Sequence, residues 1–141
     1  MSQPTSSTIN YGFGVTLQLP FAEVVSRVTE ALKAEGFGIL TTIDVQATMK
    51  TKLDVDYAPY TILGACNPTL AHRAITIEPT VGLLLPCNVV IREVPEGMRV
   101  DIVDPDAMLG IVRNEAMMAV AAEARAKLQR VAASLQVAPH V

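Results

Sequence analysis

The chain has 141 residues, half of them hydrophobic, and a formal net charge of −3. This length suits a single domain with one sizeable core. The 11 Lys and Arg are spread along the chain, Trp is absent and aromatic residues make up 4%. Neither a phosphate-binding basic patch nor a platform for stacking bases is expected, so we predict no binding of nucleic acid.

The N-terminal sequence MSQPTSSTIN is polar and has no basic segment followed by an apolar core, so no signal peptide is expected. The longest apolar run, at 81–85, is far too short to span a bilayer. Two cysteines in a chain that is not exported are expected to be reduced thiols. We therefore predict a soluble cytoplasmic protein without membrane association. Residues 1–9 would be a flexible arm, 10–136 a single domain and 137–141 a tail.

The first part of the domain alternates strands with helices. Hydrophobic residues at every second position over 11–19 predict a half-buried strand. An apolar stripe over 21–35 predicts an amphipathic helix, which Gly36 ends. A second strand is expected to begin at Phe37, and a short helix follows over 45–53.

Residues 60–93 hold both cysteines and one of the two histidines. They read as strand, short helix and strand, because Asn67-Pro68 and Glu78-Pro79 bound a helical segment between two apolar ones. A Pro-x-Gly turn at 94–97 then joins two alternating strands into a hairpin.

The segment Asp104-Pro105-Asp106 ends the second strand of this hairpin. Apolar residues at three- and four-residue steps predict the longest helix over 114–135. Together these elements predict a two-layer α+β domain, with an antiparallel sheet covered on one face by two main helices and with short extra helices. The uncovered sheet face leads us to expect a homodimer.

A Cys-Asn pair occurs twice, as Cys66-Asn67 and as Cys87-Asn88. Asn67 is placed to cap the helix that begins at Pro68, and the first backbone N–H groups of that helix would face whatever binds there. Two interpretations of the cysteines remain open. Each is either a small buried hydrophobic residue or a thiolate, which the helix N-terminus beside Cys66 would favour.

His72 lies one turn into the same helix, and Glu78 closes it. His72 is either a surface histidine or an acid–base group or axial ligand of a cofactor. Glu78 is either a solvated helix end or a second polar group of the same pocket. The spacing of the cysteines and His72 matches no recognised zinc module, so no metal site is predicted. The sequence contains no GxGxxG, P-loop, HExxH or CxxC motif.

Residues 62–93, ILGACNPTLAHRAITIEPTVGLLLPCNVVIRE, resemble a family known as domain of unknown function 302, and 30–53 and 103–111 look similar to it as well. The resemblance implies a curved antiparallel sheet with two main helices, similar to the TATA-box-binding-protein-like architecture, and often a dimer. It implies no activity. The motif positions are therefore only candidates for a site: Gly64, Cys66, Asn67, Pro68, Glu78, Pro86, Cys87 and Asn88.

Three functions are compatible with these observations. The first is a dimeric module that binds a small molecule or a cofactor, with haem considered among the cofactors. Its site residues would be Cys66, Asn67, His72, Glu78, Cys87 and Asn88. The second is a thiol-dependent enzyme or sulfur carrier that uses Cys66 or Cys87. The third is a structural or interaction protein without a ligand. The sequence favours the first.

Overall fold

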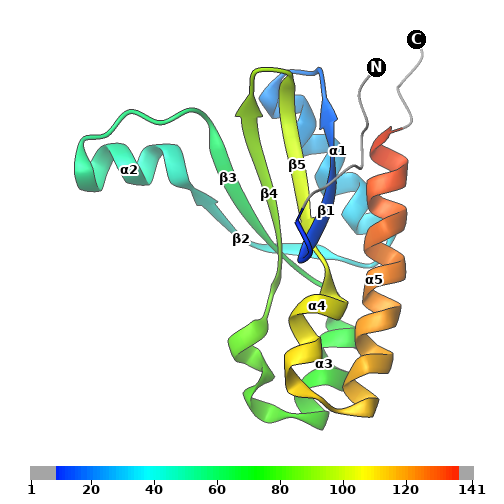
Figure 1. Cartoon of the computed structure of the whole chain (residues 1–141). Coiled ribbons are helices and arrows are strands. Elements are labelled where there is room, and N and C mark those ends of the chain that lie inside the picture. The colour runs from blue at the N-terminus through cyan, green and yellow to red at the C-terminus, as the bar shows by residue number, and fades with distance from the viewer. Residues whose placement is uncertain (1–8, 137–141) are drawn as a thin grey trace.

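Five strands form one antiparallel sheet in the order β1-β5-β4-β3-β2 (Figure 1). The computed structural model describes residues 9–136, so the arm predicted at 1–9 (apart from residue 9) and the tail at 137–141 lie outside the described residues. The strands are β1 (Gly12–Leu17), β2 (Gly38–Asp44), β3 (Tyr60–Cys66), β4 (Cys87–Val94) and β5 (Gly97–Val103). The predicted antiparallel sheet is confirmed.

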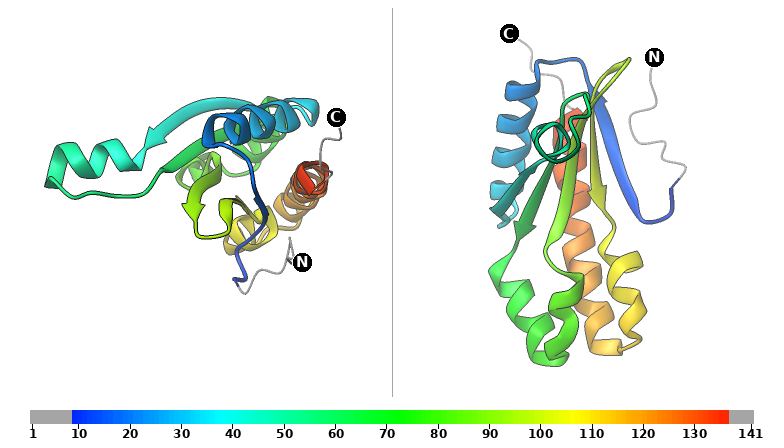
Figure 2. Two further views of the ribbon diagram at one scale, coloured as in Figure 1. Left: turned by 90° about the horizontal axis from the view of Figure 1, so that it is seen from above. Right: turned by 90° about the vertical axis from the view of Figure 1, so that its left-hand side faces the viewer.

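Five α-helices and two short 3₁₀ helices are found in the described residues. They are α1 (Phe21–Ala34), α2 (Val45–Leu53), α3 (Pro68–Ile77), α4 (Pro105–Leu109), α5 (Glu115–Gln136), η1 (Pro79–Leu84) and η2 (Gly110–Val112). The two longest, α1 and α5, lie on the same face of the sheet and contact each other (Figure 2). This confirms the predicted two-layer α+β architecture.

The apolar stripes of the two long helices meet the sheet in the main core. Val28 and Leu32 of α1 and Leu128 of α5 are fully buried there, together with Val89 and Val100 from the central strands. These stripes recur at helical spacing in the sequence, which is why they bury one face of each helix. Leu128 therefore lies where both helices and the sheet come together.

A second cluster of buried residues lies beyond the end of the sheet. It joins α3, η1, α4 and the first half of α5, and its members are Leu70, Ala74, Val81, Leu109, Met117, Val120, Ala121 and Ala124. With 22 residues, α5 is about 33 Å long, which is enough to contribute to both clusters. The strand ends of β3 and β4 meet this second cluster.

Three short helical segments, α4, η1 and η2, were not predicted. Asp104-Pro105-Asp106 does end β5, but Asp104 Oδ1 accepts a hydrogen bond from the Asp106 backbone N–H at 2.9 Å and begins α4. An Asp followed by Pro is also a typical helix start. Of the other two, η1 begins directly after Glu78 and η2 follows directly after α4.

The glycines of β1 allow close approach of the neighbouring strand. A Cβ built at Gly14 would overlap the backbone carbonyl oxygen of Val100 in β5. The residue without a side chain therefore lies where the backbone of β5 comes closest.

Candidate functional site

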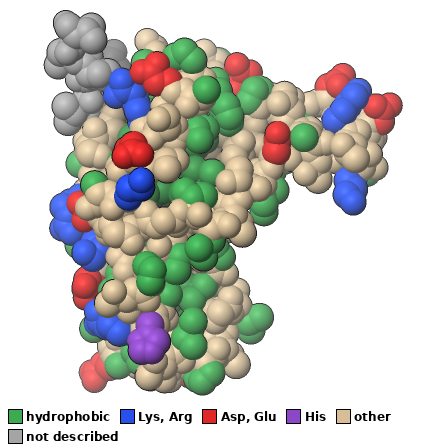
Figure 3. Space-filling view, turned by 180° about the vertical axis from the view of Figure 1, so that it is seen from behind, with side chains coloured by type: hydrophobic (Ala, Val, Ile, Leu, Met, Phe, Trp, Pro, Cys, Tyr) green, Lys and Arg blue, Asp and Glu red, His purple; other side chains and the backbone are tan. Residues whose placement is uncertain are grey.

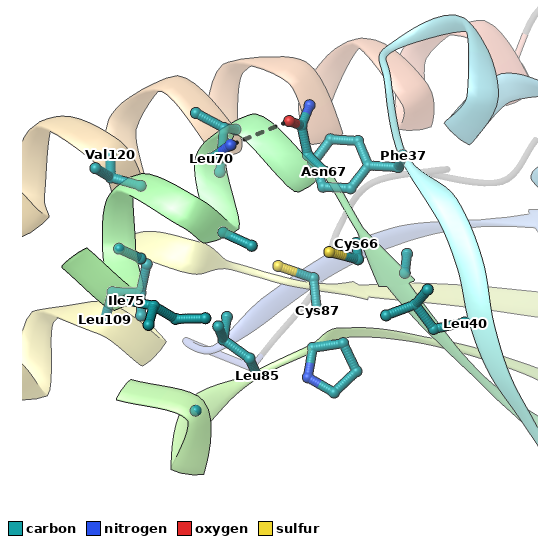
Figure 4. A pocket seen from close by; sticks show the side chains of 16 residues that line it. Phe37, Leu40, Cys66, Asn67, Leu70, Ile75, Leu85, Cys87, Leu109 and Val120 are labelled. Carbon is teal, nitrogen blue, oxygen red and sulfur yellow. Dashed lines mark hydrogen bonds between the residues drawn. The ribbon is translucent and has the colours of Figure 1, made fainter. Parts of the chain in front are cut away.

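An apolar cavity of about 290 Å³ lies between the ends of β3 and β4 and the second cluster of buried residues. Its walls come from segments far apart in the sequence. They are Phe37, Leu40, Ala65, Cys66, Asn67, Leu70, Ala71, Ala74, Ile75, Gly82, Leu85, Pro86, Cys87, Leu109, Val120 and Ala124. Figure 4 shows these side chains around the space.

The cavity exists because many of its lining residues are small. Ala71 and Ala74 of α3, Ala65 of β3 and Ala124 of α5 offer only a methyl group, and Gly82 of η1 offers no side chain. Larger residues at these positions would interdigitate and fill the space, as protein interiors normally do. The space opens to solvent, because two lining residues, Leu40 and Ile75, remain exposed.

The two cysteines lie side by side in the cavity wall. Ala65 in β3 pairs with Cys87 in β4, which places Cys66 one residue further along. Figure 4 shows both sulfur atoms pointing into the same space. Cys87 is buried, whereas Cys66 is half-buried.

Burial, and to a smaller extent the neighbouring Cys66, raises the pKa of the Cys87 thiol from an ordinary 9.0 to about 11. Desolvation disfavours the charged thiolate, which is the physical cause of the larger effect. Cys87 is therefore a neutral thiol at physiological pH. The free energy of unfolding that depends on the neutral Cys87 thiol is fully present below pH 9 and is lost as the pH rises through about 11.

Asn67 is the polar side chain of the cavity wall, and its amide already has partners. Asn67 Oδ1 accepts a hydrogen bond from the Leu70 N–H at 3.2 Å, which confirms the predicted helix cap. Its Nδ2 donates to the Glu35 carbonyl oxygen at 3.3 Å. The Ala71 N–H is bonded to the Asn67 carbonyl oxygen. Two of the helix N–H groups expected to face a ligand are therefore used within the chain.

Gly36 makes the approach of Asn67 feasible. Gly36 has a left-handed φ of +85°, and a Cβ built there would lie 2.9 Å from Asn67 Nδ2. This residue therefore ends α1, as predicted, and leaves room for the amide that joins α1 to α3.

The other three residues proposed from the sequence do not line the cavity. His72 is exposed on α3. The helix buries the face that carries Leu70 and Ala74, and His72 lies on the other side. Asn88 is exposed and sits between buried Cys87 and Val89, since successive strand residues point to opposite faces.

Glu78 lies at the junction of α3 and η1. Its Oε2 accepts a hydrogen bond from Thr80 Oγ1 at 3.0 Å, and it lines a separate depression between η1 and η2. The structure thus brings together Cys66, Asn67 and Cys87 and places His72, Glu78 and Asn88 elsewhere.

Several cavity residues were missed in the sequence. Phe37, Leu109 and Val120 approach the cysteines only through the tertiary fold, and no local pattern indicates that contact. One sequence signal could have indicated a cavity here: the small residues Ala71 and Ala74 both lie on the side of α3 that faces it.

Residues 9–136 include no group of three or more His, Cys, Asp or Glu side chains arranged to hold a metal ion. In the same part of the chain, no helix has the length and apolar character that crossing a membrane requires.

We predict that Cys87 is inert toward iodoacetamide in the folded protein at pH 7.5, because alkylation needs the thiolate. The protein is alkylated folded or in denaturant and digested with trypsin, and the two cysteines fall in different peptides because Arg73 lies between them. The Cys87 peptide should be modified only after unfolding. Rapid modification of Cys87 in the folded protein would contradict the account of a buried neutral thiol.

Comparisons with known proteins place the chain in a family. The family described as "Domain of unknown function DUF302" matches residues 13–135. A solved structure, the crystal structure of an uncharacterized conserved DUF302 protein from Bacillus stearothermophilus, superposes with a TM-score of 0.81 at 27% sequence identity, covering 87% of this chain and 96% of that one. No match was found among curated proteins. The chain therefore belongs to the DUF302 family, as its central motif indicates.

Proposed function

We propose that the protein is a binding module for a small, largely apolar molecule, which occupies the cavity beside Cys66 and Cys87. The observation behind this proposal is the cavity itself. Its volume of about 290 Å³ lies just below the range of about 300–1,000 Å³ for ligand sites, which suits a small molecule. Its lining residues are almost all aliphatic, aromatic or thiol side chains.

The polar groups around the cavity favour a neutral ligand over a charged one. No Lys, Arg, His, Asp or Glu lines it, and the Asn67 amide is bonded to Leu70 and Glu35. A buried ionic group would therefore lose its hydration without gaining a counter-charge. The cavity therefore suits a ligand that is apolar over most of its surface.

A haem site is not proposed, since the lining residues do not suit it. His72, considered from the sequence as an axial ligand, is exposed and is not among them. The cavity is also small for a flat macrocycle, and no cationic side chain lines it to receive propionate groups.

Cys87 supports binding better than thiol chemistry. A nucleophilic or sulfur-carrying cysteine needs a lowered pKa, whereas the pKa of Cys87 is raised to about 11. As a neutral thiol, Cys87 serves as a small apolar part of the wall.

Two naphthylamine probes test the proposal. N-phenyl-1-naphthylamine is neutral, and 8-anilino-1-naphthalenesulfonate has a similar ring system with a sulfonate. We expect the neutral probe to bind saturably, at one molecule per chain, with a large increase in fluorescence. The anionic probe should bind at least about tenfold more weakly, a difference of about 1.4 kcal/mol. No saturable binding of the neutral probe, or equal affinity for both, would contradict an apolar cavity site.

A further inference from the structure

Cys66 and Cys87 are two free thiols in the wall of one cavity. The pairing of Ala65 with Cys87 places the two cysteines diagonally across β3 and β4, and Figure 4 shows both sulfur atoms directed into the same space. Burial is the first cause of the raised pKa of Cys87 and Cys66 is the second, so the two thiols are near enough to interact electrostatically. The fold thus presents two soft ligand atoms to one cavity.

The rest of the cavity wall supplies no further metal ligand. Among the described residues, no His, Asp, Glu or Met side chain lines it, and the Asn67 amide is bonded to Leu70 and Glu35. Zinc in proteins almost always takes four ligands, so two thiols are an incomplete set for Zn(II). Soft thiolate ligands select Cu(I), a closed-shell ion that forms stable complexes with only two of them. The ligand set therefore fits Cu(I) better than Zn(II).

The charge of a Cu(I) dithiolate suits its place beside α3. Binding of one Cu⁺ ion forms two Cu–S bonds and breaks two S–H bonds, and the two protons pass to the solvent without any transfer of electrons. One negative charge remains on the complex. Cys66 directly precedes Asn67, the N-cap of the ten-residue helix α3, and a helix N-terminus stabilises negative charge nearby. Because a coordinating thiol is deprotonated outright by the metal ion, the neutral state of Cys87 does not prevent binding.

The cavity also provides a route for the ion to reach the thiols. Two residues of its wall, Leu40 and Ile75, remain exposed at the surface. Cys66 is half-buried, whereas Cys87 is buried. Cys66 can therefore receive the ion first, and Cys87 then completes the site in a space that has no other ligand.

We propose that Cys66 and Cys87 bind one Cu(I) ion as the two ligands of a dithiolate site in the cavity wall. The sequence predicts no metal site, because the spacing of the cysteines and His72 matches no zinc module. The fold joins the two thiols across neighbouring strands, which needs no spacing motif. This site does not rest on the proposed binding of an apolar molecule.

Anaerobic titration of the full chain with Cu(I) alone tests the site, with bathocuproine disulfonate as the competing chelator and both thiols kept reduced. Wild-type protein should retain one Cu(I) per chain. Cys66→Ala and Cys87→Ala should each lower the affinity at least about 100-fold, which is the upper end of the loss caused by removing an outer-shell partner of a metal site. Circular dichroism checks that each variant is folded, and Cys87→Val replaces Cys87→Ala if that variant is not.

His72→Ala is the matched control. His72 is another residue of α3 with a metal-binding side chain, but it is exposed and lies outside the cavity. Figure 3 shows the histidine side chain, in purple, on the surface of the molecule. This variant should bind Cu(I) with the affinity of wild type. X-ray absorption of the copper-loaded protein should show two sulfur neighbours and no nitrogen neighbour.

Four results would overturn the proposal: wild-type protein that yields all its Cu(I) to the chelator, retention in either cysteine variant, loss in His72→Ala, or affinity for Zn(II) equal to that for Cu(I). The titration uses no organic ligand, so it is independent of the proposed binding function. Protein that binds Cu(I) but not the neutral naphthylamine probe refutes only the apolar ligand. Protein that binds the probe but not Cu(I) refutes only the metal site.

Discussion

Replacing Leu128 with Ala is expected to reduce the free energy of unfolding by about 2–5 kcal/mol. Leu128 is fully buried where α1, α5 and the sheet meet. The substitution removes contacts with both helices and the sheet and leaves a cavity that this close-packed region cannot readily collapse. Urea unfolding followed by circular dichroism measures the change.

Ile111→Ala is the control for this prediction. Ile111 is a side chain of similar size that is 68% exposed on η2, and its truncation should change the free energy of unfolding by less than about 0.5 kcal/mol. If Leu128→Ala falls in that same small range, the helices do not pack on the sheet as described.

The long, regular elements of this fold were predictable because their patterns are local. The stripe of α5, recurring at three- and four-residue steps, predicted a helix over 114–135, and the observed bounds are Glu115–Gln136. Asn114 caps this helix by accepting a hydrogen bond from the Met117 N–H at 3.0 Å. Bounds of α3, set by Asn67-Pro68 and Glu78-Pro79, were also correct.

Short elements were missed because one signal has two meanings. Asp104-Pro105 ends a strand and also starts a helix, and only the packing of Leu109 against α5 favours the helical outcome. The sequence predicts that helical structure ends before Pro79, yet the chain continues as η1 with Val81 buried. Such tertiary contacts cannot be read from a window of a few residues.

The candidate site could be located only in part from the sequence, because some of its walls form through tertiary contacts. Cys66, Asn67 and Cys87 lie at strand ends that the sequence pattern already placed near α3, and the structure brings them to one cavity. His72 lies on the solvent-facing side of α3. Asn88 follows Cys87 in β4, so its side chain points to the opposite face of the strand. The remaining walls depend on the packing of α4 and α5, which no spacing within 60–93 reveals.

Two substitutions at neighbouring positions of α3 test the central claim, that the cavity binds the ligand. Ala71 lines the cavity, whereas His72 is exposed beside it. Ala71→Leu and His72→Leu introduce the same side chain one residue apart, so they differ chiefly in whether it fills the cavity. Equal melting temperatures would show that both variants are folded.

Titration with N-phenyl-1-naphthylamine is the measurement that decides between the outcomes. We predict that Ala71→Leu weakens binding at least about tenfold, or about 1.4 kcal/mol, because the added carbon atoms occupy the space of the probe. His72→Leu should bind within about twofold of wild type, since an exposed side chain outside the cavity contributes little. Unchanged binding in Ala71→Leu, or loss of binding only in His72→Leu, would contradict the cavity as the binding site.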